Sequence, residues 1–396
     1  MARFGRFFLG ALNEVYGGVF ARPSPFNPDA PPRERRPLRT GPPEIRTFQT
    51  RDGVGLKLTR FEGGRKGPVL LTPGFGTSAL AFTIDTTETN LPEYLFERGY
   101  DVWILDYRAS PDLPSASTQF TLDDVARYDY PAAVEQVLSV TGADSLQVMA
   151  HCVGSLTFLM ALAAGLGGVR SAVCSQLTLH PRVVPLNKLR SGLYVANLLT
   201  AVGVDTLTTG EGGEDEAKDE KGWLERLYDG VLRVYPAGKE RCESQVCRRI
   251  LFMYGEVFDH DQLNPATHDA LHEMFGVANL RTFKQIARSI RKGWVVSAEG
   301  EDVYLPASER FRLPITFLHG ERNRLFLPEG SRLTWEHLAR ANGVSLYQRH
   351  LIPDYAHMDC FIGKNAARDV YPLVAADLDR HNAKLSPGLR ARGYRA

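Results

Sequence analysis

The sequence has few cysteines, no CxxC pair, no long apolar run and almost no net charge. Its five cysteines, Cys152, Cys174, Cys242, Cys247 and Cys360, argue against both a disulfide framework and a zinc site, and a reducing cytoplasm is the simplest compartment. No run of roughly eighteen apolar residues occurs, so we expect no bilayer-spanning helix. The formal net charge of +1 shows no excess of basic residues of the kind that binds nucleic acid. We therefore expect no metal, no cofactor and no nucleic-acid partner.

The composition of the chain is that of a globular protein. Its 396 residues are 43% hydrophobic and 23% charged, enough for one large α/β domain with an insertion or for two ordinary domains. Residues 1–20 begin with basic and apolar residues, but Asn13 and Glu14 interrupt the run and no clean cleavage site follows, so we expect mature sequence rather than a secretory signal. Apolar residues at helical spacing predict an amphipathic helix here. We expect this helix to pack on its own domain, to bind a partner chain or to lie on a membrane surface.

The order of strand and helix patterns predicts the domain organisation. Residues 1–44 are expected to form the amphipathic helix and a proline-rich linker. Residues 45–184 and 309–385 open with a β-hairpin and then alternate between buried strands and helices, which is typical of a mostly parallel, doubly wound sheet. Buried strands are expected at residues 68–72 and 101–106, and a helix at residues 123–140. This alternation stops over residues 185–308, which predicts an inserted helical cap with a solvated charged loop at 210–222. Its aromatic residues form either an apolar pocket over the site or the cap's own core.

The stretch from Ser145 to Ala163 reads as a buried strand, a tight turn and a helix, with Cys152 at the turn. Residues 150–154, AHCVG, fit the nucleophile-elbow pattern GxSxG with alanine for the first glycine and cysteine for serine. A thiol is an effective nucleophile when a neighbouring base raises its thiolate fraction. The alternative is a buried structural cysteine. Rapid alkylation near neutral pH is expected of an activated thiol only.

Two backbone amides are candidates for an oxyanion hole. In elbow enzymes the anion of the tetrahedral intermediate is held by the amide after the nucleophile, here Val153, and by an amide from the loop after an earlier strand. The sequence Gly74-Phe75-Gly76 follows the first predicted core strand, so Phe75 is expected to supply the second amide. An ordinary strand-to-loop turn is the alternative.

The remaining catalytic groups are expected after the last two strands. His357 lies on the loop after the final strand, where an elbow enzyme needs its base. The orienting residue should lie about three positions after Gly320, where the chain has Asn323. We expect Asn323 to orient the imidazole through its amide oxygen. Glu321 is the alternative.

Three segments resemble a known family: LPEYLFERGYDVWILDYR, FTLDDVARYDYPAAVEQVLSVTG and YAHMDCFIGKNAARDVYP. They are similar to segments of α/β-hydrolase-fold proteins, and more narrowly of the gastric and lysosomal acid lipases, over residues 45–182 and 312–380. The resemblance places Cys152 at the family's serine and Asn323 at its aspartate. Polyhydroxyalkanoate synthases also carry a cysteine in this elbow. The cap matches neither family.

Together, the residues and the resemblance predict a capped α/β-hydrolase with a Cys152, His357 and Asn323 triad. We expect acyl transfer from a lipid-like ester or thioester, to water or to another acceptor, through a thioester on Cys152. Cysteine tolerates asparagine in the third position better than serine does, because a thiolate–imidazolium pair needs orientation more than added charge. The alternative is a non-catalytic binding or scaffold protein of the same fold.

Overall fold

The computed structural model describes residues 33–184, 206–207, 244–276 and 278–382. The predicted amphipathic helix of residues 1–20, the charged loop at 210–222 and most of the first half of the predicted cap lie outside these residues. No helix in the described ranges is long and apolar enough to cross a membrane. The four described cysteines form no disulfide.

The core is an eight-stranded sheet in the order β1-β2-β4-β3-β5-β6-β9-β10. The β1–β2 and β2–β4 pairs are antiparallel and all others are parallel. The predicted doubly wound sheet is therefore confirmed, with its opening hairpin turning at Asp52 and Gly53. The strands are β1 (Glu44–Gln49), β2 (Gly55–Phe61), β3 (Pro68–Thr72), β4 (Asp101–Asp106), β5 (Leu146–His151), β6 (Val169–Ser175), β9 (Ile315–Gly320) and β10 (Tyr347–Ile352).

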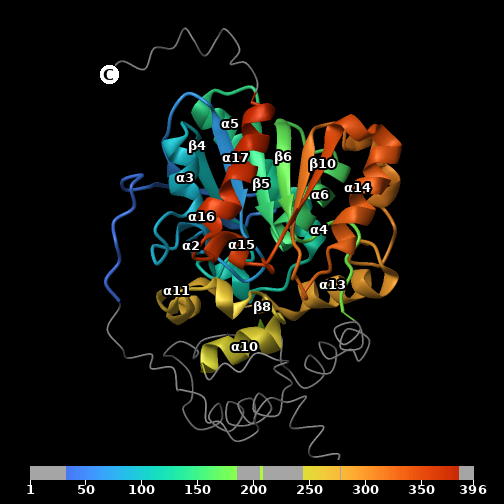
Figure 1. The fold of residues 1–396 in the computed structure, drawn as a ribbon. Helices are drawn as coiled ribbons and strands as arrows, with labels where there is room; N and C mark the ends of the chain where they lie inside the picture. The colour runs from blue at the N-terminus through green and yellow to red at the C-terminus, as the bar shows by residue number, and fades with distance from the viewer. Residues whose placement is uncertain (1–32, 185–205, 208–243, 277, 383–396) are drawn as a thin grey trace, which may run out of the picture.

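Helices cover both faces of this sheet (Figure 1). One face packs against α5 (Tyr130–Thr141), α6 (Val153–Ala163) and α14 (Glu329–Asn342), and the other against α3 (Leu91–Glu97) and α17 (Tyr371–Arg380). Strands β3, β4 and β5 are buried along their whole length, as expected for parallel strands covered on both sides. Shorter elements complete the core: α2 (Leu80–Thr83), η1 (Pro114–Ser117), α4 (Leu122–Asp124), η2 (Val125–Asp129), η5 (Val344–Leu346), α15 (Asp359–Ile362) and α16 (Ala366–Asp369).

The helix predicted over residues 123–140 differs in its first half. Thr121 caps it, accepting a hydrogen bond from the amide of Asp124, whose side chain accepts in return from the amide of Thr121. A π-helical turn then spans Val125–Asp129 before the regular helix α5 begins. Pro131, which lacks an amide hydrogen, lies in the first turn of α5, directly after the π-helical turn.

The described part of the predicted cap is mainly helical and lies at the carboxyl ends of the parallel strands (Figure 1). Its elements are β7 (Thr206–Leu207), α10 (Gln245–Met253), η3 (His260–Gln262), α11 (Pro265–Asp269), α12 (Leu271–Met274), β8 (Ala278–Asn279), α13 (Leu280–Lys292) and η4 (Leu305–Arg310). The short antiparallel pair of β7 and β8 is an element that the prediction of a largely helical cap did not include. We keep the name cap for the described residues 206–207, 244–276 and 278–308.

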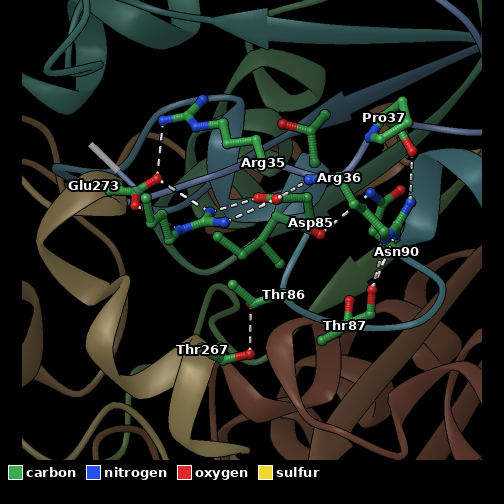
Figure 2. Close-up of polar contacts among 12 residues, drawn as sticks. Arg35, Arg36, Pro37, Asp85, Thr86, Thr87, Asn90, Thr267 and Glu273 are labelled. Carbon is green, nitrogen blue, oxygen red and sulfur yellow. Dashed lines mark hydrogen bonds and ion pairs between the residues drawn. The ribbon is translucent and has the colours of Figure 1, made fainter. Parts of the chain in front are cut away.

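An extended segment, residues 33–40, joins the core to the cap through arginines (Figure 2). The guanidinium of Arg33 donates to Asp85 of the core at 2.8 Å and to Glu273 of α12 at 2.8 Å. Arg36 contacts both carboxylate oxygens of the fully buried Glu93, at 2.6 and 2.7 Å. The predicted linker therefore makes specific charged contacts in its last residues, and we call residues 33–40 the arginine strap.

Candidate active site

Cys152 lies at the turn between β5 and α6 in a strained backbone conformation. Its φ of 54° and ψ of −124° lie in a region that L-residues rarely adopt and that persists only where the surroundings enforce it. Gly154 explains part of this enforcement, because a Cβ there would lie 2.4 Å from the carbonyl oxygen of Pro73. The helix start is thus pressed against the end of β3. Cys152 follows the last residue of β5 and so lies at the carboxyl ends of the parallel strands.

The two predicted oxyanion amides lie on segments next to Cys152: Val153 follows it in the chain, and the Phe75 loop passes so close that a Cβ on Gly74 would lie 3.3 Å from the Cβ of Cys152. Burial raises the pKa of the Cys152 thiol to about 12, while hydrogen bonds from the amides of Val153 and Phe75 act in the opposite direction. The Val153 amide is the first of α6, so its hydrogen has no partner within the helix. The structure therefore brings the two segments whose amides were predicted from the sequence to Cys152.

The cap packs directly over the loop that carries Phe75. The amide of Gly276 donates to the carbonyl of Gly76 at 3.0 Å, and Thr77 forms an isolated bridge with Phe275. The ring of Phe75 meets those of Tyr254 and Phe283 edge-on, with centroids 6.4 and 5.2 Å apart. These aromatic contacts join cap and core, so the apolar cap residues do more than form a separate core.

His357 is buried and contacts Asn323, as predicted, but through the opposite end of the amide. The amide nitrogen of Asn323 lies 3.0 Å from Nδ1 of His357. Its oxygen accepts from the amides of Leu325 and Phe326, each at 3.0 Å. Because backbone amides can only donate, they fix the side-chain orientation. The expectation that the amide oxygen faces His357 is therefore wrong.

This orientation decides which nitrogen of His357 carries the proton. An N–H of Asn323 points at Nδ1, so Nδ1 accepts and the proton of the neutral ring lies on Nε2. Glu321, the alternative orienting residue, has an exposed side chain, whereas Asn323 is 1% exposed. Among the described contacts of Cys152 and His357, no hydrogen bond joins the two side chains directly.

Gln176 is a residue of the site that the sequence did not indicate. It follows β6 with a φ of 72° and is 1% exposed. Its side-chain oxygen accepts from the Asn323 amide nitrogen at 2.8 Å and from the amide of Gly320 at 3.2 Å. Gln176 thus supports the same orientation of Asn323. No motif in the sequence marks it, since its role depends on neighbouring strands brought together by folding.

Two other buried histidines, His151 and His319, lie near His357. The rings of His151 and His357 have centroids 4.8 Å apart, and His319 lies 3.4 Å from the amide nitrogen of Asn323. Burial lowers the pKa of His357 well below its usual value, that of His151 to about 3 and that of His319 to about 4. The imidazoles and the Cys152 thiol are therefore all neutral near pH 7.

Lipases are among the known proteins with related sequences. Residues 67–190 match the family model described as alpha/beta hydrolase fold. Lipase lipl-5 of Caenorhabditis elegans is 30% identical over 384 residues, which cover 87% of this chain and 91% of that protein. Lipase lipl-3 of the same organism is 24% identical over 400 residues, covering 87% of this chain and 90% of that protein.

A solved structure with a similar fold is a soluble variant of monoglyceride lipase from Saccharomyces cerevisiae in complex with a substrate analog. It has a TM-score of 0.53 and 17% identity, and the match covers 87% of this chain and 98% of that chain. With the family model and the sheet order, this likeness confirms the predicted α/β-hydrolase fold.

Proposed function

Because the chain belongs to the lipase family of the α/β-hydrolase fold, we propose that it is an esterase- or lipase-type hydrolase with Cys152 as nucleophile. One observation carries this proposal: Cys152 lies in a strained turn between β5 and α6, pressed against the loop of Phe75, where a Cβ on Gly74 would lie 3.3 Å from the Cβ of Cys152. A structural cysteine has no need of this arrangement. An acyl carbonyl attacked by the sulfur would place its developing oxyanion within reach of the amides of Phe75 and Val153.

In the proposed mechanism the sulfur of Cys152 attacks the acyl carbonyl as the thiol proton passes to His357. The amides of Phe75 and Val153 hold the oxyanion. Collapse of the intermediate forms a thioester and releases the alcohol, which takes the proton from the imidazolium. His357 then accepts a proton from water, whose oxygen attacks the thioester carbonyl. Collapse of this second intermediate breaks the carbon–sulfur bond, releases the carboxylic acid and lets the sulfur take the proton back from the imidazolium as a thiol.

We expect Asn323 to slow the transfer of the thiol proton to His357. Its N–H to Nδ1 favours the tautomer with the proton on Nε2, so a less populated tautomer must accept the thiol proton. The same amide in a serine triad costs about 10⁴ in rate. A thiol tolerates the defect better because it loses its proton more readily than a hydroxyl does. The pairing of cysteine with asparagine is therefore chemically consistent.

We propose a lipid-like acyl ester as the substrate. The aromatic contacts of Phe75 with Tyr254 and Phe283 make the surroundings of the oxyanion loop apolar. Each methylene of an acyl chain buried there contributes about 0.8 kcal/mol. Specificity constants should therefore rise along a series of acyl lengths before levelling, and a flat series would argue for a small polar substrate.

The test is intact-mass analysis after incubation with acyl esters and thioesters of increasing chain length. We expect a covalent acyl adduct on the wild-type chain that is absent from Cys152→Ala, with hydrolysis lost in that variant. Cys174→Ala, which changes a buried cysteine outside the site, is the matched control and should retain both. Turnover by Cys152→Ala would refute the nucleophile assignment.

The second candidate function is non-catalytic binding of an acyl ligand by the same fold. It is favoured by the Asn323 contact, which orients His357 unfavourably for a base, and by the high pKa of Cys152. Binding of the ester without any adduct or hydrolysis would identify this function.

A further inference from the structure

Three side chains of the kind that bind transition metals gather in the cap. They are Cys247 on α10, His260 in η3 and His268 on α11. Each offers one ligand atom, and these atoms all lie within 4.8 Å of one another. The sulfur of Cys247 is 3.3 Å from Nε2 of His260. The cluster lies outside the site described above and shares no residue with it.

The spacing of these atoms is close to that of a tetrahedral zinc site. Zinc bonds of about 2.3 Å to sulfur and about 2.0 Å to nitrogen place neighbouring ligand atoms roughly 3.3 to 3.6 Å apart. The Cys247–His260 pair already has this separation. The widest separation needs to shorten by little more than about 1 Å to bring all three ligands onto one ion.

The chemistry of the ligands selects the metal. One thiolate and two imidazoles suit zinc, whereas calcium and magnesium require oxygen ligands. Cys247 is 6% exposed and lies in the apolar cluster that includes Phe258, which limits competition from water. The carboxylate of Asp269 lies 3.7 Å from Nδ1 of His268, so an acid is available beside one ligand, as is common around metal-bound histidines.

The ligands come from elements that are too short to be stable alone. The η3 turn has three residues and α11 has five, far below the length at which an isolated helix persists. The same segment holds the loop that carries His357. The amide of Met358 donates to the carbonyl of Val257 at 2.7 Å, and that of Lys364 donates to the carbonyl of Gln262 at 2.8 Å.

We propose that Cys247, His260 and His268 bind one zinc ion, which fixes the cap against the His357 loop. Three protein ligands leave a fourth position for water or a further donor. The sequence predicted no metal because the spacing of these residues matches none of the short zinc motifs. The site stands whether or not Cys152 is the nucleophile.

The test uses the tag-free full-length chain, stripped of metal with a chelator and then titrated with zinc. We expect about one zinc per chain by elemental analysis, a higher melting temperature after zinc is added, and a thiolate-to-metal charge-transfer band when cobalt replaces zinc. Measuring the same quantities in Cys152→Ala separates this site from the proposed function, since that variant should bind zinc normally even if it lacks activity.

Variants of the ligands make the proposal specific. Cys247→Ala, His260→Ala and His268→Ala should each weaken zinc binding by at least about tenfold, while Cys174→Ala and the exposed His272→Ala should not. Cys247→His keeps a ligand, so it should retain zinc and lose the charge-transfer band. Less than about a tenth of an equivalent of zinc on the folded wild-type chain, or binding unchanged in the ligand variants, would overturn the site.

Discussion

At the scale of single residues, Asn323 is the position where the structure most changes the interpretation of the sequence. The position was predictable, because it follows β9 at the distance expected for an orienting residue. The direction of the amide was not, since it depends on the backbone donors Leu325 and Phe326 and on Gln176 from β6. Sequence patterns identify which residue meets His357 but not which of its atoms does so.

We predict that Asn323→Asp raises the specificity constant for ester hydrolysis. A carboxylate accepts the Nδ1 hydrogen of His357 and stabilises the imidazolium, so Nε2 becomes free to take the thiol proton. Gln176 must turn its amide, because its oxygen would otherwise face the new charge. We expect the specificity constant to rise at least about tenfold. This is less than the roughly 10⁴-fold loss of rate that replacing aspartate by asparagine causes in a serine triad.

Two further variants control this prediction. Asn323→Ala should lower the rate because the imidazole is free to rotate, and Glu321→Gln should change little because Glu321 is exposed. Steady-state kinetics across pH would compare all of them. Activity of Asn323→Asp equal to or below that of the wild type would show that the His357 tautomer does not limit turnover.

The thiol of Cys152 should react as an ordinary buried cysteine until a substrate is bound. With its pKa raised to about 12 by burial, the thiolate fraction grows about tenfold for each pH unit from 7 to 10. The alkylation rate, followed by intact mass with Cys152→Ala as the blank, should rise in the same way. This differs from the rapid neutral-pH alkylation expected from the sequence. A plateau reached below pH 8 would show an activated thiolate instead.

At the scale of elements, prediction succeeded where burial dominates. The strands Pro68–Thr72 and Asp101–Asp106 have the predicted bounds, because each has a short apolar run between turn residues that is too short for a typical helix. The π-helical turn at Val125–Asp129 was not predicted; it lies against α6, which is distant in the sequence, and the local apolar pattern carries no information on that contact. The β7–β8 pair was missed because two-residue strands carry no periodicity.

The elbow element leads to a prediction about Gly154. Gly154→Ala places a methyl group 2.4 Å from the Pro73 carbonyl oxygen, so the start of α6 must shift away from β3 and the Val153 amide moves with it. We expect a loss of about 1 to 3 kcal/mol in the free energy of unfolding and a large loss of activity. Gly167→Ala, where a Cβ meets nothing within 4 Å, is the control. Urea denaturation would measure both, and equal stabilities would contradict the packing argument.

At the scale of the whole molecule, the buried neutral histidines should make the fold sensitive to acid. The folded-state pKa of His151 is about 3 and that of His319 about 4, both below the ordinary 6.5. The unfolded chain therefore binds more protons than the folded one as pH falls below about 6.5, and stability falls with it. Each such histidine contributes a loss of up to about 1.4 kcal/mol per pH unit. Urea midpoints at pH 7.5, 6 and 5 would show the decline.

Substitution of one of these histidines isolates its share of the effect. Between pH 6 and 5, His319→Gln should reduce the change in the free energy of unfolding by about 1.4 kcal/mol per pH unit, which corresponds to one proton. His272→Gln, on the surface, should leave this change as it is in the wild type. A pH-independent stability over this range would mean that the histidines are protonated in the folded state.

The arginine strap sets a lower limit on the length of any useful recombinant fragment. A fragment that begins at β1 contains the whole sheet, yet it leaves Glu93 fully buried without Arg36 and Asp85 and Glu273 without Arg33. A buried carboxylate without its cation is stabilised by taking up a proton or by becoming exposed to water. In such a fragment we therefore expect the cap to pack less tightly on the core than it does in the full chain. The folding unit extends at least eleven residues upstream of the sheet, to Arg33 before Glu44.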